Sequence, residues 1–309
     1  LHTPHQRPSI ASCLKIPWSL HTSMVRLCAG LRPSPLLNGR HDWHSTPSCK
    51  LFKNNYRRHA VSTQTNRVAV ITGAAGGVGQ STVKKFAEQG YTVIGTDIRV
   101  PDGLFEHASV SYRACDVTSE SDWQALSDTV IAEHGKLDVL VNNAAILMTY
   151  TIEASSVDDY KRMMEVNSTS VFLGMKFMLD ALKKSEAASI VNISSSSALA
   201  GYPHFIAYGA AKAAVRSLTM SVAVHCQTNQ LPIRCNSVHP DGILTDMTNN
   251  MEGTFPEMEP HQAMKAFSFA CEPEAVTDVI YFLASHESRH INGAEIRVDN
   301  SSTIQMPYL

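Results

Sequence analysis

The chain has 309 residues, of which 44% are hydrophobic and 17% charged, and its formal net charge is −2. This is the balance of an ordinary globular protein, and the length suits one α/β domain of about 240–250 residues. A net charge this close to zero argues against a nucleic acid or another polyanion as partner. No run of the sequence reaches the ~18 apolar residues that a membrane-spanning helix needs.

The seven cysteines are scattered, and none of them forms a C-x-x-C pair. An odd number without regular spacing argues against a disulfide framework and indicates a reducing compartment. The histidines are equally dispersed and form no H-E-x-x-H motif, so the sequence predicts no metal site. We therefore expect a cytoplasmic protein, unless the first segment of the chain directs it to an organelle.

Residues 1–65 differ in composition from the rest of the chain. Residues 1–66 contain nine Lys or Arg but one acidic residue, Asp42, and they are rich in Pro, Ser and His without a sustained apolar period. We expect this segment to be mostly unordered. Two interpretations stay open: an organellar transit peptide, which an Arg- and Ser-rich composition resembles, or a leader foreign to the native protein, since the chain starts at Leu1.

Residues 66–309 alternate between apolar runs of strand length and helical stretches. The predicted strands are Val68–Thr72, Tyr91–Asp97, Val110–Ala114, Val139–Asn142, Ile190–Ser194, Arg234–His239 and Glu295–Val298. The predicted helices are Gly77–Gln89, Ser119–His134, Val157–Lys184, Ala207–Gln227 and Pro273–Ser285. This alternation predicts a single α/β domain of Rossmann type, with a doubly wound parallel sheet of about seven strands and helices on both faces. Ligands bind such sheets at the carboxyl ends of the strands.

The first predicted strand runs into a glycine-rich turn, T-G-x-x-x-G-x-G, at residues 72–79. Gly73, Gly77 and Gly79 permit a tight turn and a close approach of the backbone to a pyrophosphate. Val78 lies in the first turn of the following helix, whose N-terminal N–H groups attract an anion. Glycine-rich turns are common, but this one follows the first strand of a βαβ unit and so predicts a dinucleotide site.

The second predicted strand ends in Asp97, which is followed by Ile98. An acidic residue at this position accepts hydrogen bonds from the adenosine ribose and repels a 2′-phosphate. The glycine turn contains no basic residue, although Arg99 lies close enough to weaken this repulsion. The sequence therefore favours NAD over NADP, with Asp97 and Ile98 as cofactor-binding residues; the alternative for Asp97 is a solvated carboxylate at a strand end.

A serine run follows the fifth predicted strand, and Tyr208 and Lys212 lie 13 and 17 residues after Ser195. Positions i and i+4 share one face of a helix, so Tyr208 and Lys212 should point together toward Ser195. A nearby ammonium and the positive nicotinamide of the oxidised cofactor favour the phenolate. Tyr208 is then the expected general base in oxidation and acid in reduction. Ser195 would hydrogen-bond the substrate oxygen, and Lys212 would also hold the nicotinamide ribose.

Each of these residues also has an ordinary explanation. A Tyr and a Lys four residues apart are common in helices, and a serine run after a strand is usually a turn. The specific signal is the order of the glycine turn, the acid, the serine and the Y-x-x-x-K pair, each beside the proper strand end.

Together these motifs resemble the compact, single-domain branch of the short-chain dehydrogenase/reductase family over about residues 66–309. The resemblance implies further site residues. Asp116 and Val117 are similar to the pair that contacts the adenine. Asn143 and Ala144 are similar to the cofactor-lining part of the family's N-N-A-G motif. Asn167 falls where the family has a helix-kinking Asn that holds a proton-relay water beside the lysine.

The stretch from Pro240 through Ile243 to Thr245 resembles the family's P-G-x-x-x-T motif, which meets the carboxamide end of the nicotinamide. Two residues depart from the family pattern. Ala145 replaces the last Gly of N-N-A-G, and Asp241 replaces the Gly after Pro240. The second change makes the local turn less certain, although the Gly that follows Asp241 can supply the needed backbone freedom.

Three short runs are most similar to bacterial 3β/17β-hydroxysteroid dehydrogenases: N-S-V-H-P-D-G-I at 236–243, F-L-A-S at 282–285 and V-D-N-S at 298–301. They imply the oxidation of an alcohol to a ketone on a bulky molecule such as a hydroxysteroid. The resemblance also implies a homodimer or homotetramer.

The segment between residues 243 and 270 is irregular and apolar, and in the family the corresponding segment covers the substrate. Its large apolar residues are Met247, Met251, Phe255, Met258, Met264, Phe267 and Phe269. Such residues suit an adaptable apolar pocket for an alcohol or ketone substrate, and ordinary packing of a surface segment is the alternative.

Three other functions stay open. A dehydrogenase or reductase of a smaller sugar or cyclic alcohol would carry the same motifs. A nucleotide-sensing module without catalysis would be expected to lack Tyr208 or Lys212. An epimerase or dehydratase of the extended branch would prefer T-G-x-x-G-x-x-G and a larger C-terminal domain, whereas only about 100 residues follow Tyr208.

Overall fold

The computed structural model describes residues 66–249, 252–253 and 269–305. These residues belong to one unit, which spans Thr63–Leu309. The predicted leader, residues 1–65, lies outside the described residues. So does most of the apolar segment that was expected to cover the substrate, including Met251, Phe255, Met258, Met264 and Phe267.

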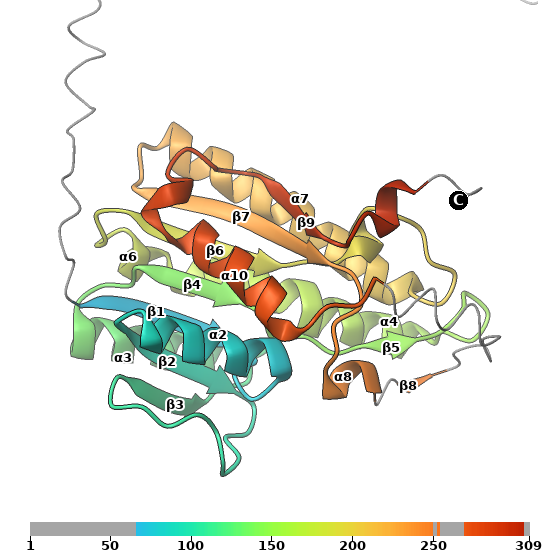
Figure 1. Ribbon diagram of the computed structural model, residues 1–309, viewed down its shortest axis with the longest axis horizontal. Helices are drawn as coiled ribbons and strands as arrows, with labels where there is room; N and C mark the ends of the chain where they lie inside the picture. Colours follow the sequence, from blue (N-terminus) through green and yellow to red (C-terminus); the bar gives the residue numbers. More distant parts are fainter. Residues whose placement is uncertain (1–65, 250–251, 254–268, 306–309) are drawn as a thin grey trace, which may run out of the picture. The chain divides into compact units, whose positions relative to one another are not determined.

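The domain is built on a seven-stranded parallel sheet with the strand order β3-β2-β1-β4-β6-β7-β9 (Figure 1). The strands are β1 (Arg67–Thr72), β2 (Tyr91–Asp97), β3 (Val110–Ala114), β4 (Val139–Asn142), β6 (Ala188–Ile193), β7 (Ile233–Pro240) and β9 (Glu295–Val298). The chain starts in the middle of the sheet at β1, winds outward to β3 and then returns to β4. The crevice between β1 and β4, where the direction of winding changes, is the expected ligand site of such a sheet.

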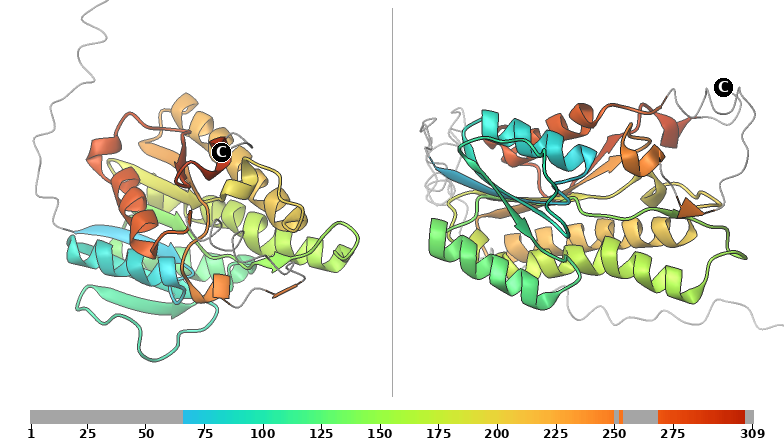
Figure 2. Two further views of the ribbon diagram at one scale, coloured as in Figure 1. Left: turned by 45° about the vertical axis from the view of Figure 1, so that its right-hand side comes forward. Right: turned by 90° about the horizontal axis from the view of Figure 1, so that it is seen from below.

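Helices cover both faces of the sheet (Figure 2). On one face lie α2 (Gly77–Glu88) and α10 (Pro273–Ala284), and on the other α3 (Glu120–His134), α5 (Ser170–Phe177) and α7 (Ile206–Thr228). The doubly wound fold predicted from the sequence is therefore confirmed.

Two separate cores explain why consecutive residues of the central strand β1 are apolar. Along β1, Val68 and Val70 pack into the core beneath α3, α5 and α7, whereas Ala69 and Ile71 pack into the core beneath α2 and α10. All four side chains are fully buried. Side chains alternate between the two faces of a strand, so a strand covered on both faces has no polar face. The two edge strands, β3 and β9, differ, because their residues are half-buried or exposed.

The long predicted helix Val157–Lys184 is interrupted. It consists of α4 (Val157–Met164), a π-helical turn η2 (Glu165–Thr169), α5, and α6 (Leu179–Leu182). The start of α4 is fixed by a capping box, in which Ser156 and Asp159 exchange side-chain and backbone hydrogen bonds. The apolar period runs through the interruption, which is why the sequence suggested one helix.

The remaining elements are short. A two-stranded parallel sheet joins β5 (Met148–Thr149) to β8 (Glu252–Gly253) and was not predicted, since two-residue strands carry no periodic signal. The other short elements are η3 (Ser196–Ala198), α8 (Asp246–Asn249), η4 (His286–Ser288) and η5 (Ser302–Ile304). The four cysteines in the described part of the chain form no disulfide bonds; they are Cys115, Cys226, Cys235 and Cys271. Among the described residues, none of the helices combines the length and the apolar character that crossing a bilayer requires.

Candidate active site

The glycine turn after β1 has the shape that a phosphate cradle needs. Gly73 has a φ of +64°, a conformation that side chains other than glycine rarely adopt. A Cβ on Gly79 would collide with the Gly73 carbonyl oxygen and lie 2.8 Å from Ala74 Cα. No side chain caps the N-terminus of α2, whose N-cap residue is Gly76. Backbone N–H groups at this end of α2 therefore have no side-chain cap, as the binding of a pyrophosphate requires.

Asp97 lies against this turn at the end of β2. Its carboxylate accepts hydrogen bonds from the backbone N–H of Ala75 at 3.0 Å and of Ile98 at 2.8 Å. The Ile98 side chain is 66% exposed. The acid and the exposed apolar side chain flank the glycine turn, as a site for an adenosine requires.

The end of β4 is tied to the same turn. Asn143 Nδ2 donates to the carbonyl oxygens of Thr72 and Gly73, at 2.9 and 3.2 Å. The backbone N–H groups of Asn143 and Ala144 both donate to the Thr72 hydroxyl at 3.0 Å. A Cβ on Gly73 would lie 2.8 Å from Ala144 Cα, so glycine at this position permits the close approach of the two loops.

The loop after β3 is held by its own hydrogen bonds. The Asp116 carboxylate accepts from the Thr118 N–H and hydroxyl, at 2.9 and 2.7 Å. The Val117 carbonyl accepts from Trp123 Nε1 at 2.9 Å, and the Val117 side chain is nearly buried. These contacts fix the loop beside the end of β2, where the adenine contacts were expected.

The loop after β7 completes the predicted cofactor set. Pro240 is the last residue of β7, and Ile243 pairs with Cys271 in a short parallel bridge. A Cβ on Gly77 would lie 2.7 Å from Thr245 Cγ2, so Thr245 lies directly over the glycine turn. The predicted cofactor residues other than Tyr208 and Lys212, which lie on α7, are therefore at or just after the carboxyl ends of β1, β2, β3, β4 and β7.

The predicted reactive residues meet at the end of β6. Ser195 precedes η3, and its hydroxyl accepts hydrogen bonds from the Ser197 N–H at 3.1 Å and the Ser197 hydroxyl at 3.0 Å. A further side-chain hydrogen bond joins Ser195 to Tyr208, in the first turn of α7. Lys212 Nζ lies 5.6 Å from the centre of the Tyr208 ring. The i and i+4 positions of α7 thus share the face predicted from the sequence.

Burial controls both titratable groups. It raises the pKa of Tyr208 to about 12, and the hydrogen bond with Ser195 opposes this only in part. It also lowers the pKa of Lys212 to about 8. Lys212 Nζ donates to the carbonyl of Ile193 at 2.9 Å, and the side chain is 2% exposed.

The phenolate expected beside Lys212 and an oxidised nicotinamide stays a prediction, because burial by itself favours the protonated phenol. Burial raises the pKa of Tyr208 more than the hydrogen bond with Ser195 lowers it, so the phenol keeps its proton at neutral pH. A neutral phenol is the form that donates a proton in reduction. Its deprotonation in oxidation needs a further positive charge close to the hydroxyl.

Asn167 lies in the π-helical turn η2 and is fully buried. Its amide oxygen accepts from the Ile146 N–H, and Nδ2 donates to the Ile146 carbonyl and to Met163 Sδ, each at 2.8 Å. Asn167 thus anchors the loop that follows β4. The expected kink is present as this turn, and π-helical turns occur frequently at functional sites.

Sequence reasoning missed two residues next to the site, His239 and Asp241. His239 Nδ1 lies 3.1 Å from the Ser195 carbonyl oxygen, and Asp241 accepts a hydrogen bond from Ser196. The available signals were a histidine inside an apolar strand and the departure from the family's glycine at position 241.

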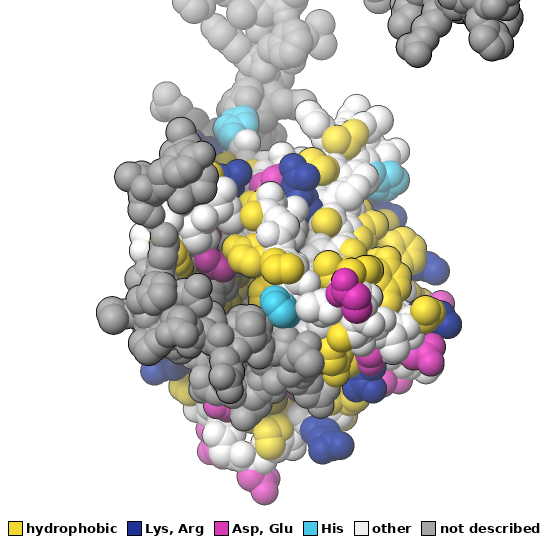
Figure 3. All heavy atoms as spheres, turned by 90° about the vertical axis from the view of Figure 1, so that its right-hand side faces the viewer, with side chains coloured by type: hydrophobic (Ala, Val, Ile, Leu, Met, Phe, Trp, Pro, Cys, Tyr) yellow, Lys and Arg dark blue, Asp and Glu magenta, His cyan; other side chains and the backbone are white. Residues whose placement is uncertain are grey.

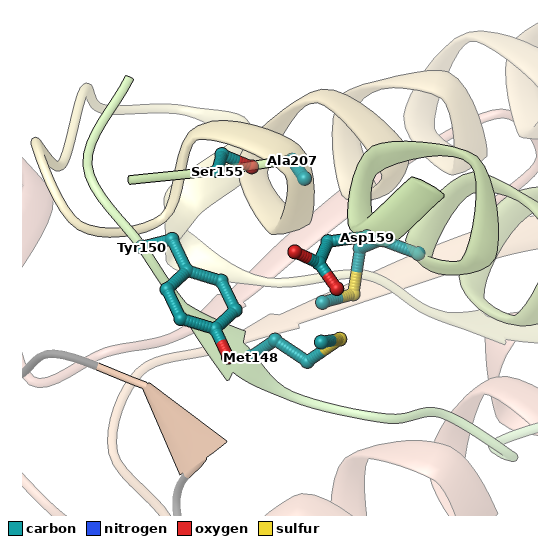
Figure 4. Close-up of a pocket in the computed structure, with 6 residues that line it drawn as sticks. Met148, Tyr150, Ser155, Asp159 and Ala207 are labelled. Carbon is teal, nitrogen blue, oxygen red and sulfur yellow. The ribbon is translucent and has the colours of Figure 1, made fainter. Parts of the chain in front are cut away.

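A shallow hollow borders the site on the side of α4 (Figure 4). It is lined by Met148, Tyr150, Ser155, Asp159, Met163 and Ala207. Met163 and Ala207 belong to the small apolar cluster against which Tyr208 packs. On the face of the molecule at which the strands end, hydrophobic side chains gather (Figure 3).

The fold and these residues define an oxidoreductase of the doubly wound α/β class with a site for a nicotinamide dinucleotide. The sequence profile of a family described as "Enoyl-(Acyl carrier protein) reductase" matches residues 73–302. The chain belongs to the short-chain dehydrogenase/reductase family, whose members use NAD or NADP. The resemblance seen in the sequence is thereby confirmed.

The chain aligns with nearly the whole length of several curated relatives. The 3-beta-hydroxysteroid dehydrogenase of Comamonas testosteroni is 36% identical over 242 residues, which cover 76% of this chain and 95% of that protein. A cyclopentanol dehydrogenase of a Comamonas species is 34% identical, covering 77% and 97%. An NADP-dependent (R)-specific alcohol dehydrogenase of Lentilactobacillus kefiri is 32% identical, also covering 77% and 97%. The ligand-free aldohexose dehydrogenase of Thermoplasma acidophilum superposes with a TM-score of 0.67 at 30% identity, covering 78% of this chain and 96% of that one.

Proposed function

We propose that the protein transfers a hydride between NAD(H) and the carbinol or carbonyl carbon of a secondary alcohol or ketone, with Tyr208 as acid/base. The observation that carries this proposal is the assembly at the end of β6. The Ser195 hydroxyl is hydrogen-bonded to Tyr208, and Lys212 lies beneath the tyrosine ring. This group lies at the same edge of the sheet as the glycine turn.

The roles of the side chains follow from their positions. The bound nicotinamide supplies the hydride or accepts it. In oxidation Tyr208 Oη takes the proton of the alcohol, and in reduction it returns a proton to the carbonyl oxygen. Ser195 Oγ holds that oxygen. Lys212 would hold the nicotinamide ribose. It also adds positive charge beneath the phenol, and the charge of a bound oxidised cofactor would add to it.

Asn167 supports this site from η2. It fixes the loop at Ile146 and so the wall next to Tyr208. We assign to it the water-holding role that the family resemblance implies, on a proton path that passes Lys212.

The proposed cofactor is NAD rather than NADP. The Asp97 carboxylate lies against the Ala75 N–H, beside the place of the adenosine ribose, where it would repel a 2′-phosphate. The proposed cofactor contacts are Gly73, Gly77, Val78, Gly79, Asp97, Ile98, Asp116, Val117, Asn143, Ala144, Tyr208, Lys212, Pro240, Ile243 and Thr245.

The proposed substrate is a bulky, largely apolar alcohol such as a hydroxysteroid. The partly exposed Met148 offers an adaptable apolar side chain at the hollow beside Tyr208, and the fully buried Met163 packs behind it. The similarity to a 3-beta-hydroxysteroid dehydrogenase favours the same class. A smaller cyclic alcohol is the second candidate, favoured by the similarity to cyclopentanol dehydrogenase.

We also propose a homodimer or homotetramer in the cytoplasm. Phe172 on α5 and Met220 and Val224 on α7 are exposed apolar side chains on the same side of the sheet. A second copy that covers them would remove apolar area from water.

The absence of disulfide bonds among the cysteines of the described residues is consistent with a reducing compartment. Light scattering of the purified protein at micromolar concentration should report more than one chain; a monomer would contradict the assembly.

The function is tested by steady-state formation of NADH with a 3β-hydroxysteroid, a 17β-hydroxysteroid, cyclopentanol and an aldohexose. We expect turnover with at least one secondary alcohol, and at least tenfold higher kcat/KM with NAD than with NADP. An enoyl thioester with NADH serves as the contrasting substrate. Turnover of the thioester alone would overturn the proposal, and so would the absence of turnover in a protein that binds NAD.

A further inference from the structure

Four consecutive serines, 194–197, follow β6, and the first three are each held by a different part of the molecule. The Ser194 hydroxyl donates to the carbonyl of Lys212 on α7 at 2.9 Å. The Ser195 carbonyl and the Ser196 hydroxyl are held by β7 and the residue after its end. Of the three serine side chains, Ser195 is the one that is hydrogen-bonded to Tyr208. The backbone of Ser195 is therefore set by these anchors, and its hydroxyl is held further by the N–H and hydroxyl of Ser197.

His239 is the anchor behind Ser195. It is fully buried in β7, with Nδ1 3.1 Å from the Ser195 carbonyl oxygen and Nε2 2.8 Å from the Ser237 hydroxyl. A carbonyl oxygen only accepts hydrogen bonds, so Nδ1 carries the hydrogen. Nε2 is then the acceptor of the neutral imidazole, and the Ser237 hydroxyl donates to it. Burial lowers the pKa of His239, which favours this neutral form.

Asp241 is the second anchor. Its carboxylate Oδ1 accepts from the Ser196 hydroxyl at 2.9 Å, and its backbone N–H donates to the Val298 carbonyl at 3.2 Å. The family pattern has glycine at this position, which lacks a side chain and cannot make the first of these bonds. The departure noted in the sequence therefore adds a contact to the serine turn. A hydrogen bond to a carboxylate is stronger than one between neutral groups.

We propose that His239 and Asp241 are positioning residues, which together set the Ser195 hydroxyl against Tyr208 and the substrate oxygen. The inference rests on the proposed role of Ser195. Neither residue needs to touch the substrate, because each acts through the backbone or side chain of the serine turn. A displacement of about 1 Å at a reacting group can cost on the order of 100-fold in rate, so a modest shift of this turn is enough to matter.

A purely structural role makes a different prediction. A buried histidine that serves only the fold would, when replaced, lower the stability without changing the Ser195–Tyr208 contact. A positioning residue would change kcat and the environment of the Tyr208 hydroxyl while NAD binding persists. Two substitutions of His239 distinguish the structural role from the positioning role further. Asn carries its Nδ2 near the place of His Nδ1 and can still donate to the Ser195 carbonyl. Gln places its amide nearer to the position of Nε2.

The test uses His239→Leu, His239→Asn, His239→Gln, Asp241→Ala and Asp241→Asn in the full chain. With the best alcohol of the substrate panel, we expect kcat to fall about 10- to 100-fold in His239→Leu, His239→Gln and Asp241→Ala. His239→Asn and Asp241→Asn should recover most of that loss, because each keeps the required donor or acceptor. The Kd for NAD should change less than about threefold in all five. Equal kcat in His239→Asn and His239→Gln would overturn the proposal, even if His239→Leu failed to fold.

A double-variant cycle separates this inference from the proposed function. If His239 acts through Ser195, His239→Gln should add little loss in a protein that already carries Ser195→Ala. Full additivity of the two losses would overturn the positioning role and leave the catalytic proposal standing. Normal turnover of Ser195→Ala by itself would instead overturn the role of Ser195.

A second readout needs no substrate. In protein labelled with ¹³C at tyrosine Cζ, the Tyr208 signal is the one absent from Tyr208→Phe. It should move in Ser195→Ala, because the hydrogen bond to the phenol is lost. His239→Gln and Asp241→Ala should move it in the same direction, and His239→Asn should leave it near its original place. A Tyr208 signal that does not respond to either residue would refute the positioning role.

Discussion

Replacement of Lys212 by Met should change the free energy of unfolding through two opposing contributions, and only one of them depends on pH. The lysine is 2% exposed, and burial lowers its pKa to about 8. In the unfolded chain its pKa returns to ~10.4, and each unit of difference corresponds to about 1.36 kcal/mol. Burying the charged lysine therefore costs roughly 3 kcal/mol at pH 7. Lys212→Met removes that cost, but it also leaves the Ile193 carbonyl without its donor, which costs about 1–3 kcal/mol.

The dependence on pH separates these two contributions. Between the folded pKa and the unfolded pKa the unfolded chain binds the proton more strongly, so the stability of the unmodified protein rises with pH. The loss of the Ile193 contact does not titrate. The free energy of unfolding of Lys212→Met minus that of the unmodified protein should therefore fall by about 2–3 kcal/mol between pH 7 and pH 10.

Urea unfolding of both proteins at several pH values measures this difference. Lys161→Met, at an exposed lysine of α4, is the matched control and should show a nearly constant difference. A difference for Lys212→Met that does not change with pH would refute the reasoning, because Lys212 would then titrate as an ordinary surface lysine. The same variant should lose turnover and bind NAD more weakly.

Three further outcomes are expected. Gly79→Ala should destabilise the protein by about 1–3 kcal/mol and weaken NAD binding, because its Cβ would press on the Gly73 carbonyl; unchanged urea unfolding and NAD affinity would contradict this. Asp97→Ala should narrow the preference for NAD over NADP in kcat/KM, since the repulsion of the 2′-phosphate is removed, and an unchanged ratio would argue against that role. A chain that starts at Thr63 should fold and turn over normally, and loss of soluble activity would show that the preceding residues matter.

The sequence was sufficient for the central sheet because its strands are buried on both faces. In β1 the residues from Val68 to Ile71 are apolar and buried, and in β4 so are the three residues before Asn142; this pattern allows few alternatives. The bounds of β2, β3, β4 and β9 agree with those predicted. Their order in the sheet follows from the winding rules of alternating strands and helices.

The candidate site was predictable for the same reason. The glycine turn, Asp97, Ser195 and the Tyr208–Lys212 pair follow strand ends, and the topology brings these ends to one edge. The π-helical turn at Asn167 was not predictable from periodicity, because one extra residue in a turn hardly changes the apolar pattern.

The pKa values of the site residues were also not predictable from the sequence. Spacing places Lys212 beside Tyr208, but it does not show that Lys212 is buried, that Tyr208 is partly buried, or that Lys212 Nζ donates to the Ile193 carbonyl. The raised pKa of Tyr208 follows from that burial. The contacts of His239 and Asp241 join residues more than 40 positions apart, and no local pattern encodes such pairs.

The most direct measurement of the central claim is the turnover of Tyr208→Phe beside its affinity for NAD. The substitution removes only the hydroxyl, so the fold and the Kd for NAD should persist. The kcat for alcohol oxidation should fall by about 10²–10⁴-fold, the usual contribution of general acid/base catalysis. Near-normal kcat in a variant that still binds NAD would contradict the account, because the proton would then have another acceptor.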